Sequence, residues 1–358
     1  MTNAYASAAF AGTEAVPEHL RFELGALRAW AAGRLPGLDE PAVEVRKFKG
    51  GQSNPTYRIA TPSRDYVLRR KPPGPLQPTA HAIDREFRVV SALGGTGLPI
   101  PYAWFYCDDD SVIGSEFYVV DAVDGPVHWN AELPDASPDY RRAYYTDLIA
   151  TLGKVHALDF RALGLDTFGR HDGYTARNLK RWHTIYNDTR AIDIPDMDWA
   201  AAALTERLPQ DEPVTLIHGD FGNHNVIARP DRPQVAAILD WEMSTIGNPL
   251  IDLAHAMRPW LEPPEPETGR PTLADKDLAA LGVPSIAQNI DTWQQHSGLG
   301  WAEGQYYLGF VMFRYAAMIQ GVLHRRKIGT AANTNFAHSQ ERVVVLAAKA
   351  RALLEASA

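Results

Sequence analysis

A polar loop between two apolar, strand-like segments carries the residues best suited to chemistry. The loop contains Asp220 and, five positions later, Asn225, and the next apolar strand ends at Asp240. Transfer of a phosphoryl group from a nucleotide requires a carboxylate that orients the acceptor hydroxyl, and separate oxygen ligands that hold Mg²⁺ against the phosphates. Two aspartates and an asparagine at this spacing supply those groups. The segment therefore predicts a phosphoryl-transfer site.

Two other interpretations of this loop deserve comparison. His218 and His224 could form a metal-binding pair, but the loop offers no obvious third nitrogen or sulfur ligand, which disfavours a zinc site. An isolated Asp with an Asn five positions later is also common in ordinary turns. The strand that follows, ending in Ile238-Leu239-Asp240-Trp241-Glu242, makes the phosphoryl-transfer interpretation the stronger one.

A glycine-containing loop lies upstream, between two strand-like segments, where its backbone N–H groups could bind phosphate. The Walker pattern G-x-x-x-x-G-K-[ST] is absent from the sequence, which excludes a Walker-type nucleotide triphosphatase. The expected phosphate-binding residues of this loop are Gly50, Gly51, Gln52, Ser53 and Asn54.

A cation and a carboxylate follow this loop. Strand alternation places Arg69 on the same face as Val67, and we expect Arg69 to contact the phosphates. Glu86 lies in the middle of a predicted helix and is the expected partner of Arg69. The alternative for Glu86 is an ordinary solvated surface residue.

The pattern of elements divides the chain near Asp124. Before this point, short segments rich in β-branched and aromatic residues predict strands, with helices at His19–Ala32 and Ala80–Leu93. After Gly125-Pro126, long helical patterns dominate, the first starting at Ser137-Pro138. The proline clusters at 71–78 and 259–271 are interpreted as connecting loops, or as flaps over a site. The predicted strands are Val43–Phe48, Thr56–Ala60, Tyr66–Arg70, Tyr102–Cys107 and Phe117–Val120; the later helices are Ala176–Asn187, Met197–Leu208, Leu250–Met257, Glu303–His324 and Asn333–Leu354.

Composition limits the partners and the compartment. The 358 residues carry a formal net charge of −8, which gives no reason to expect nucleic acid as a partner. No apolar run is long enough for a membrane span, and residues 1–15 do not form a signal-peptide pattern. The single cysteine, Cys107, follows aromatic residues and is expected in the core. We expect a cytoplasmic protein without a membrane partner, and the sequence defines no oligomeric state.

The motifs described above resemble those of the aminoglycoside phosphotransferase and choline kinase superfamily. Its signature is H-G-D-x-x-x-x-N followed by a strand ending in I-D-W/F-E, and the chain has His218-Gly219-Asp220 with Asn225, then Leu239-Asp240-Trp241-Glu242. Gly247-Asn248-Pro249 and Asp252-Leu253-Ala254 resemble the G-x-P-x-x-D-L-A of small-molecule kinases. A protein kinase would need a longer activation segment in this interval.

This resemblance implies a bilobal α+β fold like that of protein kinases, with a small antiparallel-sheet N-lobe and a larger, mostly helical C-lobe. It implies a flexible tail at 1–17, an N-lobe at 18–123 that binds nucleotide, and a C-lobe at 124–358 with the catalytic loop and the acceptor site. ATP and Mg²⁺ are the implied cofactors, and a small molecule is the implied acceptor. The implied roles are catalytic base for Asp220, Mg²⁺ ligands for Asn225 and Asp240, loop support for His218 and Asp252, and adenine contacts in the hinge for Asp121 and Val123.

A finer similarity points to a subgroup related to the kinase-like domain fused to acyl-CoA dehydrogenase in some animal proteins. It involves Gly153–Asp159, Tyr174–Arg177 and Arg181-Trp182. A hydroxy acid, or its acyl thioester, is the acceptor that this similarity implies. The alternatives are an aminoglycoside 3'-type phosphotransferase, a nucleotide-binding pseudokinase and a nucleotidyl transferase.

The charge of the C-terminal helices favours an acidic acceptor. Between Asp291 and Thr330 the acidic residues are Asp291 and Glu303 alone, whereas a polycationic aminoglycoside would need several carboxylates. Arg314 lies on an apolar stripe of the Glu303–His324 helix, so it needs an anion. That anion is either a core residue such as Asp252 or a substrate carboxylate or phosphate. The expected acceptor-binding residues are Glu242, Arg177, Arg258 and Arg314.

Overall fold

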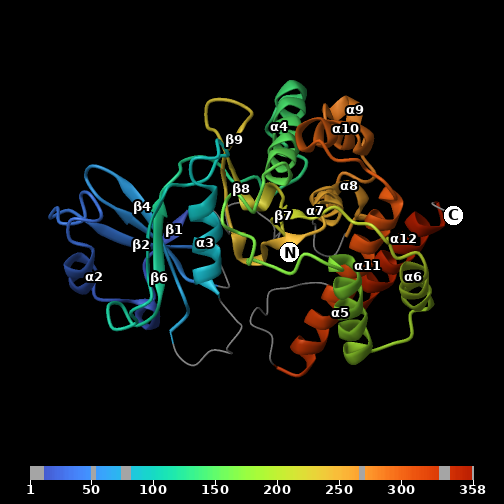
Figure 1. The fold of residues 1–358 in the computed structure, drawn as a ribbon, viewed down its shortest axis with the longest axis horizontal. Coiled ribbons are helices and arrows are strands. Elements are labelled where there is room, and N and C mark those ends of the chain that lie inside the picture. The colour runs from blue at the N-terminus through green and yellow to red at the C-terminus, as the bar shows by residue number, and fades with distance from the viewer. Residues whose placement is uncertain (1–11, 50–53, 74–81, 266–270, 330–338, 357–358) are drawn as a thin grey trace.

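The computed structural model describes residues 12–49, 54–73, 82–265, 271–329 and 339–356. Figure 1 shows an antiparallel sheet at one end of the molecule and a larger, mainly helical body at the other. The predicted α+β arrangement in two lobes is confirmed. The polypeptide passes from the first lobe to the second directly after β6 (Phe117–Asp121), close to the predicted boundary.

The smaller lobe is built on one six-stranded antiparallel sheet in the order β1-β2-β3-β4-β6-β5. The sheet starts inside the segment expected to be a tail, because Thr13 and Glu14 pair with Phe48 and Lys47. A strand of two residues has no periodicity that a sequence pattern could reveal. The other strands of this sheet are β2 (Glu44–Phe48), β3 (Thr56–Ala60), β4 (Asp65–Arg70) and β5 (Ala103–Cys107).

The two faces of this sheet have different partners. Leu68 and Val119 belong to an apolar cluster with α2 (Leu24–Ala31), and the buried Cys107 lies in the same cluster, as predicted. The expected helix over 19–32 is shorter, since a separate 3₁₀ turn covers Glu18–Leu20. Val67 lies on the opposite face, which is covered by α3 (Ile83–Leu93). Arg69 shares this inner face by strand alternation.

The larger lobe is centred on α11 (Gly304–Lys327), which is buried around most of its circumference. The helices α5 (Tyr174–Thr189), α6 (Pro195–Glu206), α7 (Pro249–Ala256) and α12 (Gln340–Glu355) pack against it. The predicted helices are all present over the described residues, with ends that differ by a few positions.

Two further helices form a layer beside this bundle. α4 (Pro138–His156) begins where predicted, since Ser137 Oγ accepts the Tyr140 N–H at 3.2 Å. α10 (Ile286–Ser297) packs against α4 and was not predicted, although Ser285 and Gln288 form a capping box at its start. Two short helices, α8 (Arg258–Leu261) and α9 (Leu278–Leu281), precede α10. α8 therefore replaces the first part of the loop predicted at 259–271.

Two short two-stranded antiparallel sheets hold the polar segments predicted to carry the chemistry. β7 (Thr215–Ile217) pairs with β10 (Thr245–Gly247), and β8 (Val226–Ala228) pairs with β9 (Val235–Ile238). The segment 218–225 links β7 to β8, and the segment 239–244 links β9 to β10. Because β7 and β10 are neighbours, this pairing brings both polar segments to the same place. Within the described ranges, no helix combines the length and apolarity that crossing a membrane requires.

Gly125 provides a test of how closely the two lobes are joined. Its φ is +150°, and a Cβ there would collide with the carbonyl oxygen of Ala228, in the strand that follows the loop at 218–225. We expect Gly125→Ala to lower the free energy of unfolding by about 2–5 kcal/mol, from backbone strain together with overpacking. Gly95→Ala is the control, because φ there is +81° but nothing lies within 4 Å, and it should cost about 1–2 kcal/mol. Chemical denaturation measures both, and equal losses would contradict the close contact.

Candidate active site

A buried carboxylate fixes the backbone of the segment 218–225, here called the catalytic loop. Asp252, near the start of α7, accepts the His218 N–H on Oδ2 at 2.7 Å and the Gly219 N–H on Oδ1 at 2.9 Å. Gly219 has φ of +86°, and a Cβ there would lie 2.6 Å from the Met243 carbonyl oxygen. Glycine is therefore required at this position. The structure places Asp252 where the resemblance implied loop support.

Two side chains that the sequence analysis did not select stand behind Asp252. His156 Nε2, at the end of α4, lies 3.2 Å from Asp252 Oδ2, and Trp293 of α10 donates its indole N–H to His156 Nδ1 at 2.8 Å. Because an indole N–H can only donate, His156 Nδ1 must accept and Nε2 carries the proton toward Asp252. Burial would raise the pKa of Asp252, but hydrogen bonds from His156 and from the His218 N–H more than offset this and lower it. Asp252 is thus held as an anion.

His218 uses both ring nitrogens within the protein. Nε2 donates to the Leu239 carbonyl oxygen at 2.8 Å, and Nδ1 accepts the Asp220 N–H at 3.3 Å. The ring is buried against Trp241, with 4.7 Å between ring centres. These contacts join the catalytic loop to the strand that leads to Asp240. They also leave no ring nitrogen for the metal pair considered with His224.

Asp220 and Asn225 lie side by side at the end of the catalytic loop. Asn225 Nδ2 donates to the Asp220 backbone oxygen at 2.9 Å and to Asp220 Oδ2 at 3.1 Å. Since the amide nitrogen faces Asp220, the Asn225 Oδ1 atom is turned toward other partners. The Asp220 side chain is 39% exposed, so a small molecule can reach its carboxylate.

Arg69 joins the two lobes through a cluster of charges. Its Nε lies 2.9 Å from Glu86 Oε2, the pairing expected from the sequence, while Nη2 lies 2.8 Å from Asp240 Oδ1 and 3.1 Å from Glu242 Oε2. Burial would lower the pKa of Arg69, but these carboxylates raise it, so Arg69 stays positively charged. Burial raises the pKa of Glu86 to about 7 against the opposing effect of Arg69. One guanidinium therefore faces three carboxyl groups, and this cluster favours a further cation.

Two residues expected at the acceptor form ion pairs with other side chains. Glu242 contacts Arg69 at 3.1 Å and accepts a hydrogen bond from Asn54 Nδ2 at 3.4 Å. Arg258 forms an ion pair with Glu262 at 2.6 Å and lies 4.4 Å from the ring centre of Tyr315. Both take part in ion pairs within the protein, and their assignment to the acceptor stays a prediction. Sequence spacing could not reveal these partners because helix and turn geometry decides them.

The remaining nucleotide-binding predictions have different outcomes. Gly50, Gly51, Gln52 and Ser53 lie outside the described residues. Asp121 accepts hydrogen bonds from Trp104 Nε1 at 2.7 Å and Arg64 Nη2 at 2.6 Å, so its carboxylate links β5 to the turn between β3 and β4. Adenine contacts by the backbone of Asp121 and Val123 stay a prediction.

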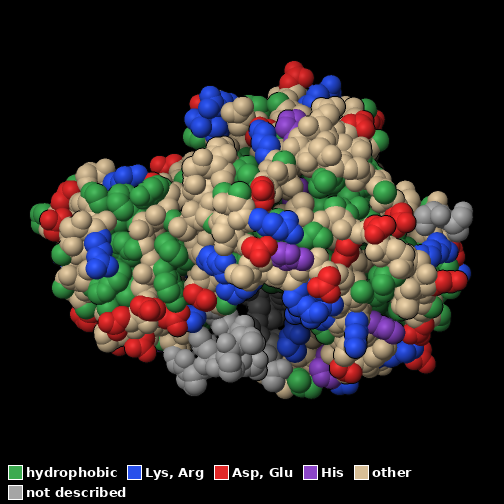
Figure 2. All heavy atoms as spheres, in the orientation of Figure 1, with side chains coloured by type: hydrophobic (Ala, Val, Ile, Leu, Met, Phe, Trp, Pro, Cys, Tyr) green, Lys and Arg blue, Asp and Glu red, His purple; other side chains and the backbone are tan. Residues whose placement is uncertain are grey.

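Figure 2 shows a recess at the junction of the lobes, flanked by acidic, basic and histidine side chains.

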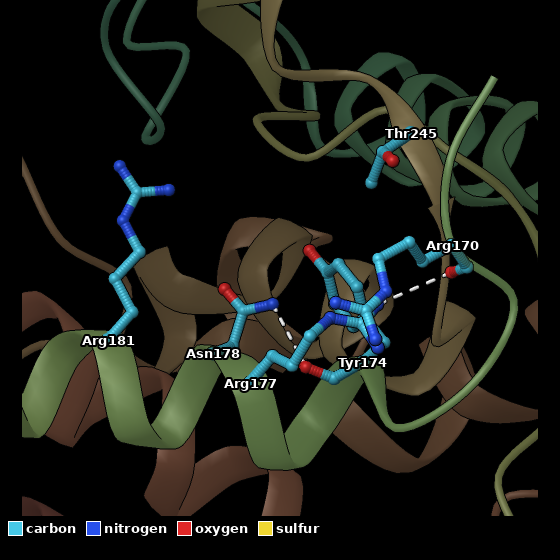
Figure 3. Close-up of a pocket in the computed structure, with 6 residues that line it drawn as sticks. All are labelled: Arg170, Tyr174, Arg177, Asn178, Arg181 and Thr245. Carbon is cyan, nitrogen blue, oxygen red and sulfur yellow. Dashed lines mark hydrogen bonds between the residues drawn. The ribbon is translucent and has the colours of Figure 1, made fainter.

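A second feature is a pocket of about 280 Å³ on the first turns of α5 (Figure 3). Three of its six lining side chains are arginines, and none is a carboxylate. Arg177 donates to the Arg170 backbone oxygen at 3.3 Å, and Asn178 donates to the Tyr174 backbone oxygen at 3.1 Å. Arg177 is the expected acceptor contact that falls in this pocket. The lining residues are Arg170, Tyr174, Arg177, Asn178, Arg181 and Thr245.

Comparisons with solved structures agree with this architecture. A Ralstonia eutropha protein, given as a candidate aminoglycoside phosphotransferase, superposes with a TM-score of 0.84 at 34% identity, covering 94% of this chain and 99% of that one. Choline kinase from Cryptosporidium parvum superposes with a TM-score of 0.65 at 10% identity, over 93% of this chain and 97% of that one. The second match supports the fold alone. The protein-kinase-like fold class is therefore confirmed.

Sequence comparisons give the family. Acyl-CoA dehydrogenase family member 11 from Gallus gallus is 38% identical over 326 residues, which are 89% of this chain and 42% of that protein. Member 10 from Mus musculus is 35% identical over 325 residues, which are 90% of this chain and 30% of that protein. The chain thus spans less than half the length of these relatives, and the resemblance to their kinase-like domain is confirmed. Residues 44–290 match the family model described as the phosphotransferase enzyme family, and the chain belongs to that family.

Proposed function

We propose that this chain is a kinase that transfers the γ-phosphoryl group of ATP to a hydroxyl group of a small acidic molecule. The observation that carries this proposal is the convergence of separate chain segments on one point. Arg69 of the small lobe contacts Asp240 at 2.8 Å, and Asp220 with Asn225 lies on the loop that His218 ties to Leu239, one residue before Asp240. Phosphoryl transfer depends on positioning and charge, and these groups supply both.

The side chains support separate roles in this reaction. Asp220 would accept a hydrogen bond from the acceptor hydroxyl, orient its oxygen toward the γ-phosphorus and take up the proton as the oxygen–phosphorus bond forms. Arg69 would face the phosphates, with Glu86 holding the guanidinium in place. The bond between the γ-phosphorus and the bridging oxygen of ADP breaks at the same time, and ADP leaves with the electrons of that bond. The low exposure of Arg69 and Glu86 limits competition from water.

The donor set near Asp240 fits Mg²⁺. Asn225 presents Oδ1 because Nδ2 is used by Asp220, and Asp240 keeps Oδ2 beside the Oδ1 atom that contacts Arg69. Hard oxygen ligands of this kind suit Mg²⁺, which leaves other positions for phosphate oxygens and water. When bound, the ion would neutralise charge on the transferring phosphate. The excess of carboxyl groups around Arg69 favours a cation here.

The pocket on α5 supports an acidic acceptor. Guanidinium groups bind carboxylates and phosphates through paired hydrogen bonds. This pocket presents three guanidinium groups, two from α5 and one from the segment that precedes it. Thr245, which lines the pocket, pairs in the β-ladder with Ile217, next to the first residue of the catalytic loop. An acceptor of moderate length could thus extend from the pocket to Asp220. The similarity to the acyl-CoA dehydrogenase family members supports a hydroxy acid or hydroxyacyl thioester.

Substituting the catalytic carboxylate tests the function directly. We expect Asp220→Ala, and the shape-conserving Asp220→Asn, to reduce phosphoryl transfer by roughly 10²- to 10⁴-fold while the protein stays folded. Asp231→Ala is the control, because Asp231 is an exposed residue whose contact is with Arg229. Thermal unfolding, ATP binding and product formation are measured on each variant. Near wild-type transfer by both Asp220 variants would contradict the role of Asp220.

Removing one oxygen ligand tests the metal assignment. We expect Asp240→Asn to weaken binding of a Mg²⁺-bound, non-hydrolysable ATP analogue by roughly tenfold or more, because ligand charge sets the affinity for the cation. Calorimetric titration with and without Mg²⁺ measures this, and Asp231→Asn serves as control. Equal affinity in the two titrations of the wild-type protein would show that Asp240 holds no metal.

The pocket predicts the charge of the acceptor. Hydroxy acids and hydroxyacyl thioesters should have a higher kcat/KM than kanamycin-like polycations, and Arg177→Ala should raise KM for the acidic acceptor by roughly 10- to 100-fold. Arg229→Ala, a change of the same charge at an exposed turn, should leave KM unchanged. A higher kcat/KM for an aminoglycoside would restore the antibiotic-kinase alternative. Binding of ATP without turnover on any acceptor would favour the pseudokinase.

A further inference from the structure

The carboxylate of Asp220 is held from two sides, and one of them lies outside the catalytic loop. Oδ2 receives Asn225 Nδ2 at 3.1 Å and lies 3.5 Å from His224 Nε2, both within the loop. Oδ1 lies 2.8 Å from His255 Nε2, on α7. The His255 side chain is 8% exposed, whereas the Asp220 side chain is 39% exposed. A buried imidazole therefore contacts the carboxylate from the protein interior.

A second contact assigns the proton on His255. Arg314 Nη2, on α11, hydrogen-bonds to His255 Nδ1. A guanidinium has donors and no acceptor, so Nδ1 must be the unprotonated nitrogen. In the neutral ring the proton is then on Nε2, where it is donated to Asp220 Oδ1. Arg314 thus selects the tautomer in which His255 can donate to Asp220.

The surrounding charges keep His255 neutral. Burial lowers the pKa of His255 to about 4, and the nearby cations Arg314 and Arg258 act in the same direction against Asp220. Burial would raise the pKa of Asp220, but hydrogen bonds from His224 and His255 lower it well below its usual range. At neutral pH the arrangement is a neutral donor facing an anion. Because its unprotonated nitrogen, Nδ1, is occupied by Arg314, His255 is not placed to take the proton of the acceptor.

We propose that Arg314 and His255 are positioning residues: Arg314 fixes the tautomer of His255, and the His255 Nε2–H fixes the orientation of the Asp220 carboxylate. This inference rests on the proposed function, because it concerns the group that meets the acceptor hydroxyl. It also replaces both earlier interpretations of Arg314. The partner of Arg314 is His255, not Asp252, and its effect is on the rate and not on acceptor affinity.

A loss of kcat without a change in KM distinguishes this positioning role from acceptor binding. We expect His255→Leu, which fills the space without a donor, to lower kcat by roughly 10- to 100-fold, the size of effect that misplacement of a catalytic group causes. KM for ATP and for the acceptor should change by less than about threefold. His255→Gln places an amide N–H near the position of Nε2 and should recover most of the lost rate. His296→Leu, on the exposed side of α10, is the control.

Arg314→Met should lower kcat in the same way, with KM for the acceptor unchanged. A rise in KM without loss of kcat would show that Arg314 binds the acceptor and would overturn the proposal. Wild-type kcat in His255→Leu would overturn it as well. If Asp220→Asn also transfers at the wild-type rate, the proposed function fails; if Asp220→Asn is inactive and His255→Leu is fully active, only the positioning role fails.

Nitrogen NMR of histidine-labelled protein gives a readout independent of turnover. The His255 signals, assigned by their loss in His255→Gln, should show an unprotonated Nδ1 and a protonated Nε2, and should stay neutral well below pH 6.5. In Arg314→Met the signals should shift toward a mixture of tautomers, while those of His296 stay unchanged. A protonated Nδ1 in the wild-type protein, or the same tautomer in Arg314→Met, would contradict the role of Arg314.

Discussion

The buried Asp252 carboxylate is the interaction on which the arrangement of the catalytic loop depends. An anion without water must be compensated by hydrogen bonds, and Asp252 obtains them from the His218 and Gly219 N–H groups and from His156. Those bonds require the loop to follow one path, which Gly219 permits through its positive φ. Asp220 follows directly, so the carboxylate proposed as the catalytic base is positioned by the backbone before any side-chain contact contributes.

A second constraint joins the two lobes. Arg69 extends from the inner face of the sheet to Glu86 on α3 and to Asp240 on the turn of the larger lobe. Arg69 and Glu86 are both buried, and burying either charge alone would be costly, so they are accommodated only together. The cluster therefore links the small lobe to Asp240, one of the expected metal ligands. The positive φ of Asp240, +61°, is part of the same turn geometry.

Much of this site could be predicted because it depends on local patterns. The spacing of Asp220 and Asn225 and the strand ending at Asp240 place three polar groups at the ends of short strands. Alternation along β4 was enough to put Arg69 on the inner face, where the structure finds it. The pairing of Glu86 with Arg69 could be predicted because Glu86 lies on the helix that follows the strand of Arg69. These predictions needed no knowledge of how distant helices pack.

The rest depends on packing that sequence spacing does not encode. α11 is buried around most of its circumference, so an apolar stripe could not show which neighbour Arg314 meets. His255 is 35 positions from Asp220 and contacts it only because α7 packs beside β7. Trp293 contacts His156 from α10. The capping box at the start of α10 was the local sequence pattern that could have predicted this helix. Glu242 and Arg258 have the residue types of acceptor contacts, but their ion pairs are with Arg69 and Glu262.

Product analysis with ATP carrying heavy oxygen at the non-bridging positions of the γ-phosphate tests the central claim most directly. If Asp220, Asn225 and Asp240 direct transfer to an acceptor hydroxyl, the mass spectrum of an acidic hydroxylated acceptor should show one added phosphate that contains the labelled oxygens, together with unlabelled ADP. An adduct with the mass of AMP would show nucleotidyl transfer instead. Label recovered only as inorganic phosphate, with every acceptor unmodified, would contradict the account of this site as a small-molecule kinase.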